Sequence, residues 1–281
     1  VSQGSAGEII PTEDDDPENT ASPATNGVPA GRYIVRGVIA RNNTISGNCD
    51  GIKISLAENC TCRGNTIKLS ENHTYNNMGI SVVKGSNIRL SYNNISGGNG
   101  YGIYAVGTDA SGKSCLIYGN AVSGFEKDGI YVGRFASESR IERNKISANA
   151  KNGIFVKHTG KSIINGNYTF KNKERGILLQ KCESADVTDN FSSGNGMNGI
   201  ELNVKSNKSR IQGNICGANK KSGLRVANSK EITVDGNSFR SNKIYAAEFS
   251  NSRISSYKSN SFDGNGNSNR IRIKNSKMPE K

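Results

Sequence analysis

A parallel β-helix, an all-β solenoid of about ten coils with three short strands per coil, is the fold that this sequence predicts. Three observations lead to it: an Asn that recurs every 22 to 28 residues, a Gly-Ile pair between successive Asn positions, and strand-like alternation around both. Self-similarity at such a period is the signature of a repeat architecture. We therefore assign residues 32–281 to one β-helix domain.

The recurring Asn is expected to mark one corner of each coil. It occurs at Asn43, Asn65, Asn93, Asn120, Asn144, Asn167, Asn190, Asn214, Asn237 and Asn260. Asn tolerates left-handed backbone angles and can bond neighbouring backbone at a tight corner. Stacked strands lie about 4.8 Å apart, so the amide of one copy can bond the next. We expect a hydrogen-bonded ladder that includes Asn65, Asn144, Asn167, Asn214 and Asn237.

The Gly-Ile pairs begin a strand in every coil. Segments such as "GIKIS", "GIYVG" and "GIFVK" alternate apolar with polar or exposed residues, which is the period of a strand. The pairs are Gly51-Ile52, Gly79-Ile80, Gly102-Ile103, Gly129-Ile130, Gly153-Ile154, Gly176-Ile177, Gly199-Ile200 and Gly223-Leu224, with Ala246-Ala247 in the ninth place. Strings such as "SRIERNKIS" place two more strands around the Asn. No segment keeps a helical period for three turns, and the Leu-rich consensus of leucine-rich repeats is missing.

The combined pattern "N-x-I-x-x-N-x-x-x-G-I-x-V" resembles the right-handed parallel β-helix repeat of the pectate-lyase-like superfamily. The resemblance covers roughly residues 33–275 and implies the fold and its right-handedness. Members of the superfamily include polysaccharide lyases, hydrolases, uronate epimerases, phage tailspikes and non-catalytic surface proteins. Fold alone therefore leaves the function open, and the function must be argued from the site.

One short stretch, "NCDGI", is similar to the Asn-Thr-Asp-Gly-Ile of polygalacturonases, whose Asp is catalytic. However, the position before the repeated Gly holds Asp50, Met78, Tyr101, Asp128, Asn152, Arg175, Asn198 and Ser222 in successive coils. The coils contain no Asp-Asp pair and neither His is flanked by Gly on both sides, so these two polygalacturonase motifs are missing, although Arg272-Ile273-Lys274 matches their Arg-Ile-Lys. The Asp-Pro-His-Glu signature of alginate epimerases is also absent. We interpret Asp50 as a turn residue, and expect Asp50→Ala to be nearly silent.

Charge is distributed unevenly along the chain. Residues 1–31 carry six acidic residues, no Lys or Arg, and four of the five Pro, which predicts a solvated arm or loop. The alternative is a cation-binding cluster at Asp14–Asp16, and calcium is the one cofactor left open; no metal ligand is assigned. Taking these six acids from 24 leaves 18 against 37 Lys and Arg, a net charge of +19 on the remainder. A domain with this positive charge attracts polyanions.

The candidate site lies on the outward side of the Gly-Ile strands, where alternate residues of stacked coils form a row. Tyr104, Tyr131, Phe155 and Lys53 are the candidate substrate-binding residues, because aromatic rings can stack on sugar rings or simply on one another. Lys157, His158, Arg225 and Glu201 are the candidate catalytic residues. Eliminative cleavage or epimerisation of a uronan needs a cation to neutralise the carboxylate and a base of lowered pKa. The alternatives are purely structural roles: Glu201 and Arg225 form a surface ion pair, and His158 begins a turn.

The remaining features limit other classes of function. Cys62 and Cys216 fall in inward positions, Cys60 and Cys115 lie two coils apart, and Cys49 and Cys182 fall in turns, so free thiols are expected. Lys and Arg are scattered through the turns without a nucleic-acid motif, which argues against nucleic-acid binding. No apolar run is long enough for a membrane span. The sequence as given does not open with a basic-plus-apolar leader, and we draw nothing about secretion from this.

The expected function is binding of an acidic, uronate-containing polysaccharide, with lyase- or epimerase-type processing left open because no intact catalytic motif is found. The alternatives are a non-catalytic surface or adhesion β-helix and a phage tail-spike segment. We expect an extracellular or cell-surface protein that is a monomer or a homotrimer.

Overall fold

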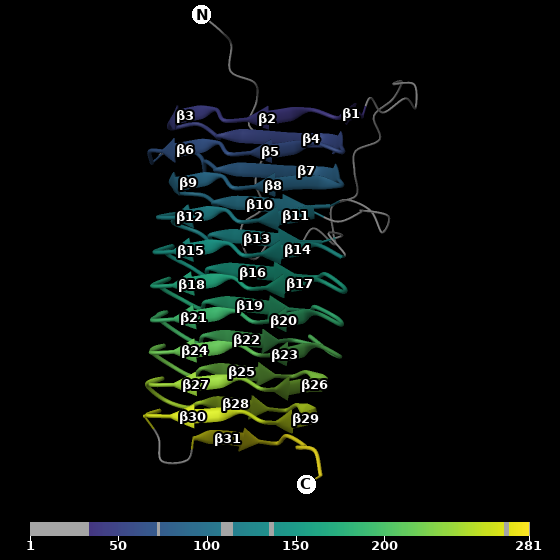
Figure 1. The fold of residues 1–281 in the computed structure, drawn as a ribbon, viewed down its shortest axis with the longest axis vertical. Coiled ribbons are helices and arrows are strands. Elements are labelled where there is room, and N and C mark those ends of the chain that lie inside the picture. The colour runs from purple at the N-terminus through teal and green to yellow at the C-terminus, as the bar shows by residue number, and fades with distance from the viewer. Residues whose placement is uncertain (1–33, 72–73, 108–114, 135–137, 267–269, 281) are drawn as a thin grey trace, which may run out of the picture. The chain divides into compact units, whose positions relative to one another are not determined.

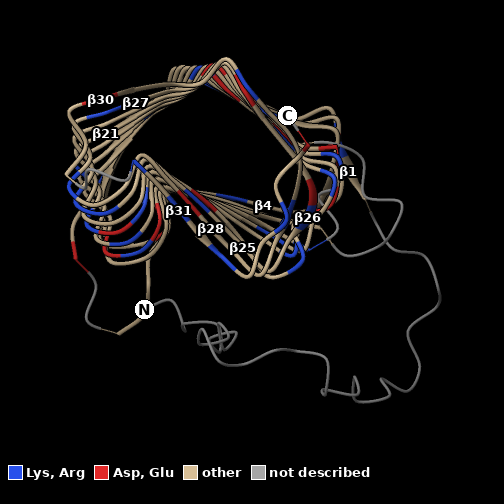
Figure 2. Ribbon diagram, turned by 90° about the horizontal axis from the view of Figure 1, so that it is seen from below, with Lys and Arg blue, Asp and Glu red and all other residues tan. Residues whose placement is uncertain are grey.

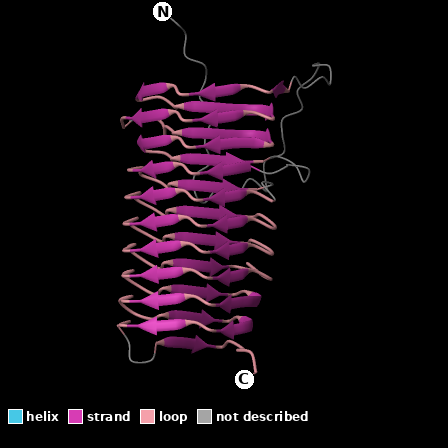
Figure 3. Cartoon of the chain, viewed as in Figure 1, coloured by secondary structure: helices cyan, strands magenta, loops and turns pink. Residues whose placement is uncertain are grey.

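The computed structural model describes residues 34–71, 74–107, 115–134, 138–266 and 270–280. These residues form strands and turns, with no helix among them, and belong to the unit Ile34–Lys281 (Figure 3). The predicted acidic arm, residues 1–31, lies outside the described residues.

Three parallel sheets run along the solenoid (Figure 1). Sheet A consists of β1 (Val35–Arg36), β4 (Ile52–Glu58), β7 (Ile80–Ser86), β10 (Ile103–Val106), β13 (Ile130–Gly133), β16 (Ile154–Lys157), β19 (Ile177–Gln180), β22 (Ile200–Asn203), β25 (Leu224–Ala227), β28 (Ala247–Ser250) and β31 (Ile271–Lys274). Its strands are the predicted Gly-Ile strands.

Sheets B and C hold the two strands that flank the recurring Asn. Sheet B consists of β2 (Ile39–Arg41), β5 (Thr61–Arg63), β8 (Ile88–Ser91), β11 (Cys115–Tyr118), β14 (Arg140–Glu142), β17 (Ile163–Asn165), β20 (Asp186–Thr188), β23 (Arg210–Gln212), β26 (Lys230–Asp235) and β29 (Arg253–Lys258). Sheet C consists of β3 (Thr44–Gly47), β6 (Thr66–Leu69), β9 (Asn94–Gly97), β12 (Ala121–Ser123), β15 (Lys145–Ser147), β18 (Tyr168–Phe170), β21 (Phe191–Ser193), β24 (Ile215–Gly217), β27 (Ser238–Arg240) and β30 (Ser261–Asp263). Each coil passes through sheets A, B and C in turn, which confirms the predicted parallel β-helix.

Inward-facing apolar residues of successive coils stack directly on one another. Ile130, Ile154, Ile177 and Ile200 are register partners in sheet A and are fully buried. The Gly before each of these residues lets the chain turn close to the next coil. A Cβ on Gly176, for example, would meet the side chains of Ser192 and Thr169 and the next coil's backbone. The repeated Gly-Ile pair therefore serves packing.

The predicted Asn ladder is continuous from Asn43 to Asn260. Along it, each Nδ2 donates to the Oδ1 of the next Asn at 2.8 to 3.0 Å. The backbone N–H of each Asn donates to the same oxygen, as Asn144 does to Asn167 at 3.0 Å. Because the interior members are at most 1% exposed, the ladder satisfies polar groups at a buried corner.

A second ladder, which the sequence analysis did not identify, lies at the corner between sheets C and A. Asn149, Asn172, Asn195, Asn219, Asn242 and Asn265 bond in the same way, with Nδ2 to Oδ1 distances of 2.9 to 3.1 Å. A shorter row of serines performs a similar task between sheets A and B, where Ser206, Ser229 and Ser252 accept backbone N–H groups.

The cysteines occupy the predicted positions. Cys62 and Cys216 are buried, and Cys60 and Cys115 lie one coil on either side of Ile88. Cys182 follows β19 in a turn, but its side chain is buried in the core. All the cysteines are free thiols, as predicted.

Candidate functional site

The residues predicted to face outward from the Gly-Ile strands form one row along sheet A. In register order the row is Lys53, Ser81, Tyr104, Tyr131, Phe155, Leu178, Glu201, Arg225 and Glu248, and Arg272 extends it. The predicted register is confirmed. The expectation that the whole row is exposed is wrong for Ser81, Leu178 and Glu201, which are 4%, 7% and 2% exposed. Ser81 lies between the longer side chains of Lys53 and Tyr104, Leu178 lies beside Phe155, and Glu201 lies beside Arg225.

The aromatic part of the row packs against itself. The rings of Tyr104 and Tyr131 are stacked, with centroids 5.3 Å apart and planes 10° apart. Phe155 meets Tyr131 edge-on at 5.4 Å, and Tyr101, in the position before the repeated Gly, lies 5.1 Å from Tyr104. Mutual stacking of this kind stabilises a sheet without any ligand. The stacked faces of Tyr104 and Tyr131 are turned toward each other and are therefore not available to a sugar.

The tyrosine hydroxyls in this cluster are poorly suited to act as bases. Burial raises the pKa of Tyr104. Burial, followed by the nearby Tyr104 and Asp128, raises the pKa of Tyr131 further. A tyrosine base needs the opposite shift. Both hydroxyls therefore stay protonated at neutral pH and can donate hydrogen bonds.

The charged part of the row is centred on Glu201. Its Oε2 accepts hydrogen bonds from Arg175 Nε and Asn198 Nδ2, each at 2.7 Å, and its Oε1 accepts one from Arg225 at 2.7 Å. Arg225 also lies 3.9 Å from Glu248. The predicted Glu201–Arg225 pair is therefore present, but Glu201 is too deeply buried for it to be a surface ion pair.

The surroundings of Glu201 keep it ionised. Burial alone would raise the pKa of its carboxyl, but the charge of Arg175, the hydrogen bonds from Arg175 and Asn198, and the charge of Arg225 together lower the pKa below its ordinary value. A carboxylate tied in this way is an anchor for two guanidinium groups. It holds Arg225, which is 30% exposed, on the outer surface of sheet A.

The other predicted site residues are only partly brought together. Tyr131 leans along its strand, so that a Cβ on Gly133 would meet the edge and hydroxyl of its ring. Gly133 is the register partner of Lys157, which places Lys157 one coil from that hydroxyl. His158 follows β16 in the left-handed region, with φ of 55°, and begins the turn. Lys53 lies three strands from Tyr131, and Arg225 lies three strands from Lys157.

Asp50 has a structural partner in the next coil. Its Oδ1 accepts the backbone N–H of Met78 at 2.8 Å. The equivalent residues Asp128, Asn152 and Asn198 accept the corresponding N–H groups of later coils at 2.8, 3.2 and 3.0 Å. An amide performs this task as well as a carboxylate, which supports the interpretation of Asp50 as a turn residue.

Basic residues line both edges of sheet A. Figure 2 shows Lys and Arg gathered in the turns at the two ends of β25, β28 and β31. At the corner between sheets C and A, the exposed lysines are Lys171, Lys173, Lys220, Lys221 and Lys243. Within the described residues, none of these ammonium groups forms an ion pair. At the opposite edge, Arg134, Lys157, Lys181 and Lys205 continue the cationic border.

A metal centre is not found on this face. Among the residues that the structure describes, no three His, Cys, Asp or Glu side chains are grouped so that they could hold a metal ion. The predicted cation-binding alternative, Asp14–Asp16, lies outside those residues. In the same part of the chain, no helix has the length and apolarity of a membrane span.

The comparisons with known proteins identify the family. A family model described as a right-handed beta helix region matches residues 109–184 and 128–277, which together exceed half of the chain. The chain belongs to this right-handed β-helix family. The handedness that the repeat pattern implied is thus confirmed. No curated protein matches the chain.

Solved structures share the β-helix at low sequence identity. The A-module of mannuronan C-5 epimerase AlgE6 from Azotobacter vinelandii has a TM-score of 0.66 and 13% identity, covering 88% of this chain and 84% of that chain. The enzymatically active domain of bacteriophage CBA120 tailspike protein 2 has a TM-score of 0.64 and 12% identity, covering 79% and 39%. The periplasmic alginate epimerase AlgG has a TM-score of 0.51 and 16% identity, covering 86% and 78%. At these identities the likeness is one of fold.

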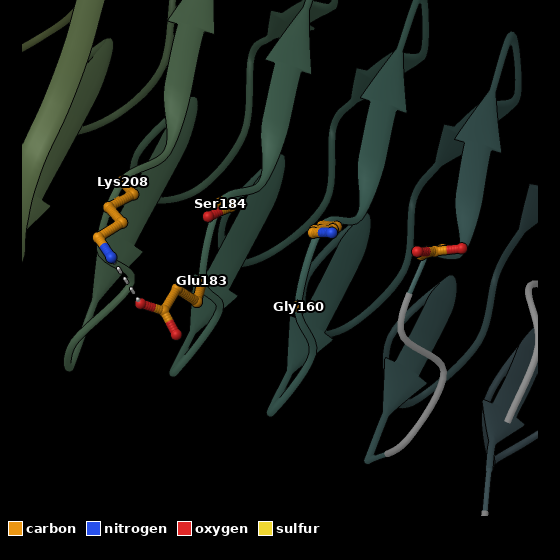
Figure 4. Close-up of a pocket in the computed structure, with 6 residues that line it drawn as sticks. Gly160, Glu183, Ser184 and Lys208 are labelled. Atoms are coloured by element: carbon orange, nitrogen blue, oxygen red, sulfur yellow. Dashed lines mark ion pairs between the residues drawn. The ribbon is translucent and has the colours of Figure 1, made fainter. Parts of the chain in front are cut away.

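The β-helix has a shallow surface pocket, but it lies away from the sheet A row. Glu138, Gly160, Lys161, Glu183, Ser184 and Lys208 line it, in the turns between sheets A and B. Lys208 Nζ lies 3.7 Å from Glu183 Oε1, and the ammonium and carboxylate point toward each other across adjacent turns (Figure 4). Both side chains are more than half exposed, so this pair adds little stability. We place the candidate site on the charged and aromatic row instead.

Sequence reasoning missed two residues of the Glu201 cluster, Arg175 and Asn198. Both occupy the position before the repeated Gly. Asn198 is three residues before Glu201, and Arg175 is in the same position one coil earlier. The sequence could have indicated this cluster, because Arg175 and Asn198 precede the repeated Gly and Glu201 faces outward from the strand that follows Asn198.

Proposed function

We propose that this β-helix binds an acidic, uronate-containing polysaccharide along the outer face of sheet A. The observation that carries the proposal is the lysine corner, Lys171, Lys173, Lys220, Lys221 and Lys243, whose ammonium groups form no ion pair with any described residue and which adjoins the strand of Arg225, the side chain that Glu201 holds in place. Lysines in equivalent turns repeat along the solenoid at multiples of about 4.8 Å. A polymer with a carboxylate on each sugar can meet several of them at once.

Binding without turnover is the outcome that the side chains support. The groups on the face with shifted pKa values move away from neutrality, Tyr104 and Tyr131 upward and Glu201 downward. Such shifts do not favour proton abstraction near neutral pH. We therefore propose a binding module whose ligand lies outside the cell or in the periplasm, and which acts as a monomer or a homotrimer.

The test compares two triple variants that remove the same charge. Lys220→Ala/Lys221→Ala/Lys243→Ala removes lysines of the corner, and Arg89→Ala/Lys230→Ala/Lys258→Ala removes exposed bases of sheet B. Affinity for immobilised alginate and polygalacturonate is measured at several salt concentrations, with dextran as the neutral polymer. The corner variant is expected to lose about tenfold or more in affinity at low salt, and the sheet B variant much less.

Equal losses in the two variants would reduce the proposal to nonspecific charge attraction, and a failure of the unmodified protein to bind either polymer would remove it. Incubation with the same polymers, with and without calcium, tests the catalytic alternative. The appearance of absorbance from an unsaturated product, or a change in uronate composition, would replace the binding module with a lyase or an epimerase.

A further inference from the structure

Sheet C carries an exposed aromatic cluster that plays no part in the sheet A site. Tyr168 on β18 and Phe191 on β21 are register partners with stacked rings, 4.5 Å between centroids and 7° between planes. Phe170 meets Tyr168 edge-on at 5.0 Å. Tyr168 is 42% exposed, although it belongs to this aromatic contact.

The fold does not require aromatic rings at these outward positions. In the other coils the same column of sheet C holds Thr44, Thr66, Asn94, Ala121, Lys145, Ile215, Ser238 and Ser261. The partner of Phe170 in the next coil is Ser193. None of these other residues is aromatic, and apart from Ile215 they are small or polar, so the coils stack here without rings. Partly exposed rings at such positions need a reason other than coil stacking.

The charges around the cluster indicate what kind of molecule could cover it. Lys145 Nζ lies 5.8 Å from the centre of the Phe170 ring, and the exposed Lys171 follows Phe170 directly. Lys173 continues toward the corner between sheets C and A. A second copy of the chain seated on this face would bring like charges together, which is unfavourable. An anionic ligand with an apolar surface fits both the rings and the lysines.

We propose that the cluster of Tyr168, Phe170 and Phe191 is a second contact surface for the acidic polysaccharide. This inference rests on the proposed function. The C–H face of a sugar ring would pack on the aromatic rings while its carboxylates meet Lys145 and Lys171. Since Lys171 and Lys173 also belong to the lysine corner, the corner joins this surface to the sheet A face. A long polymer would then contact two faces of the β-helix.

The experiment replaces the cluster with residues that sheet C already uses there. The variant Tyr168→Asn/Phe191→Ser takes its side chains from Asn94 and Ser238. The matched control, Tyr92→Asn/Tyr118→Ser, removes a surface aromatic pair of the exposed Tyr92 and the half-buried Tyr118, whose rings lie 5.4 Å apart at the corner between sheets B and C. Affinity for polymeric alginate is measured at about 50 mM and about 500 mM salt, and thermal melting and sedimentation check folding and mass.

The sheet C variant is expected to bind alginate about fivefold more weakly at both salt concentrations, because a ring contact is not screened as a charge contact is. The control variant should bind like the unmodified protein. Unchanged binding by the sheet C variant, while the lysine-corner variant is impaired, overturns this inference alone. Absence of binding by the unmodified protein overturns the proposed function and this inference together. A change of oligomeric mass in the sheet C variant would instead identify the cluster as a contact between copies.

Discussion

Asp50 shows how a residue that matches a catalytic motif can be explained by its backbone contact. Its Oδ1 bonds the Met78 N–H at 2.8 Å, and Met78 is 5% exposed. Asp50→Ala should therefore lower the free energy of unfolding by about 1 kcal/mol, since that N–H loses its partner. Our expectation from sequence, a nearly silent substitution, left out this bond. Asp50→Asn keeps an acceptor, as Asn152 does, and should match the unmodified protein in denaturant unfolding.

The interpretation of Asp50 as a turn residue would be contradicted by a measurement of activity. A folded Asp50→Asn protein that had lost a polysaccharide-cleaving activity of the unmodified protein would restore the polygalacturonase likeness.

Glu201 is a buried residue whose charge is shared by two arginines. Glu201→Gln removes the negative charge that Arg175 and Arg225 share and replaces one acceptor oxygen with an NH2 donor, so it should cost about 2 kcal/mol at neutral pH. The folded-state pKa lies below the ordinary 4.5. The stabilisation is therefore complete above about pH 4.5 and is lost as the pH falls through the lower folded-state value. Urea unfolding at a series of pH values should show a weaker acid dependence in the variant.

Glu248→Gln is the matched control for Glu201. Glu248 belongs to the same row, but its arginine contacts are longer, 3.6 and 3.9 Å, and its side chain is 19% exposed. If Glu248→Gln weakens the dependence of the free energy of unfolding on acid pH as much as Glu201→Gln does, the burial of Glu201 is not the cause of that dependence.

At the scale of the element, the Asn ladders connect one coil to the next. Asn167 accepts two N–H groups from Asn144 and donates to Asn190 and to the Ile141 carbonyl. Asn167→Ala removes all of these bonds at a buried corner, and should lower the free energy of unfolding by about 2 to 3 kcal/mol. The neighbouring Asn165, which bonds Thr188 nearer the surface, provides the control. Equal losses from Asn165→Ala and Asn167→Ala in chemical denaturation would show that burial of the ladder is unimportant.

The two ladders also show what the sequence could predict about the elements. The first ladder was predictable because its Asn lies between two strands in every coil. The second was missed because Asn149, Asn172 and their copies lie among other Asn, Lys and Gly residues that change from coil to coil. The strands of sheet A and their register followed from the Gly-Ile pairs. The burial of Glu201 did not, since it depends on side chains reaching between coils.

For the candidate site, the sequence predicted which residues share one face of sheet A, but not how their side chains are arranged. Alternation along "GIYVG" and "GIFVK" was enough to place Tyr131 and Phe155 on one face. It could not show that Tyr104 and Tyr131 would use their ring faces on each other, because that depends on side-chain torsions rather than on period. The same limit applies to sheet C, where the sequence places Tyr168 and Phe191 in register without indicating how exposed they are.

For the β-helix as a whole, the repeat structure predicts that one coil can be removed. Each coil contacts its neighbours alone, so stability is close to a sum of coil and interface contributions. Deleting residues 176–198, one full repeat, joins Arg175 to Gly199 and brings Ile154 beside Ile200 and Asn167 beside Asn214. The shortened chain should keep its β circular dichroism and unfold cooperatively, with a urea m-value lower by about one tenth. Deleting residues 176–187 removes only about half a coil and puts strands of different sheets out of register, so this chain should fail to fold. If both deletions fold equally well, or if the full-coil deletion does not fold, the coils are not the independent units that their hydrogen bonds and packing indicate.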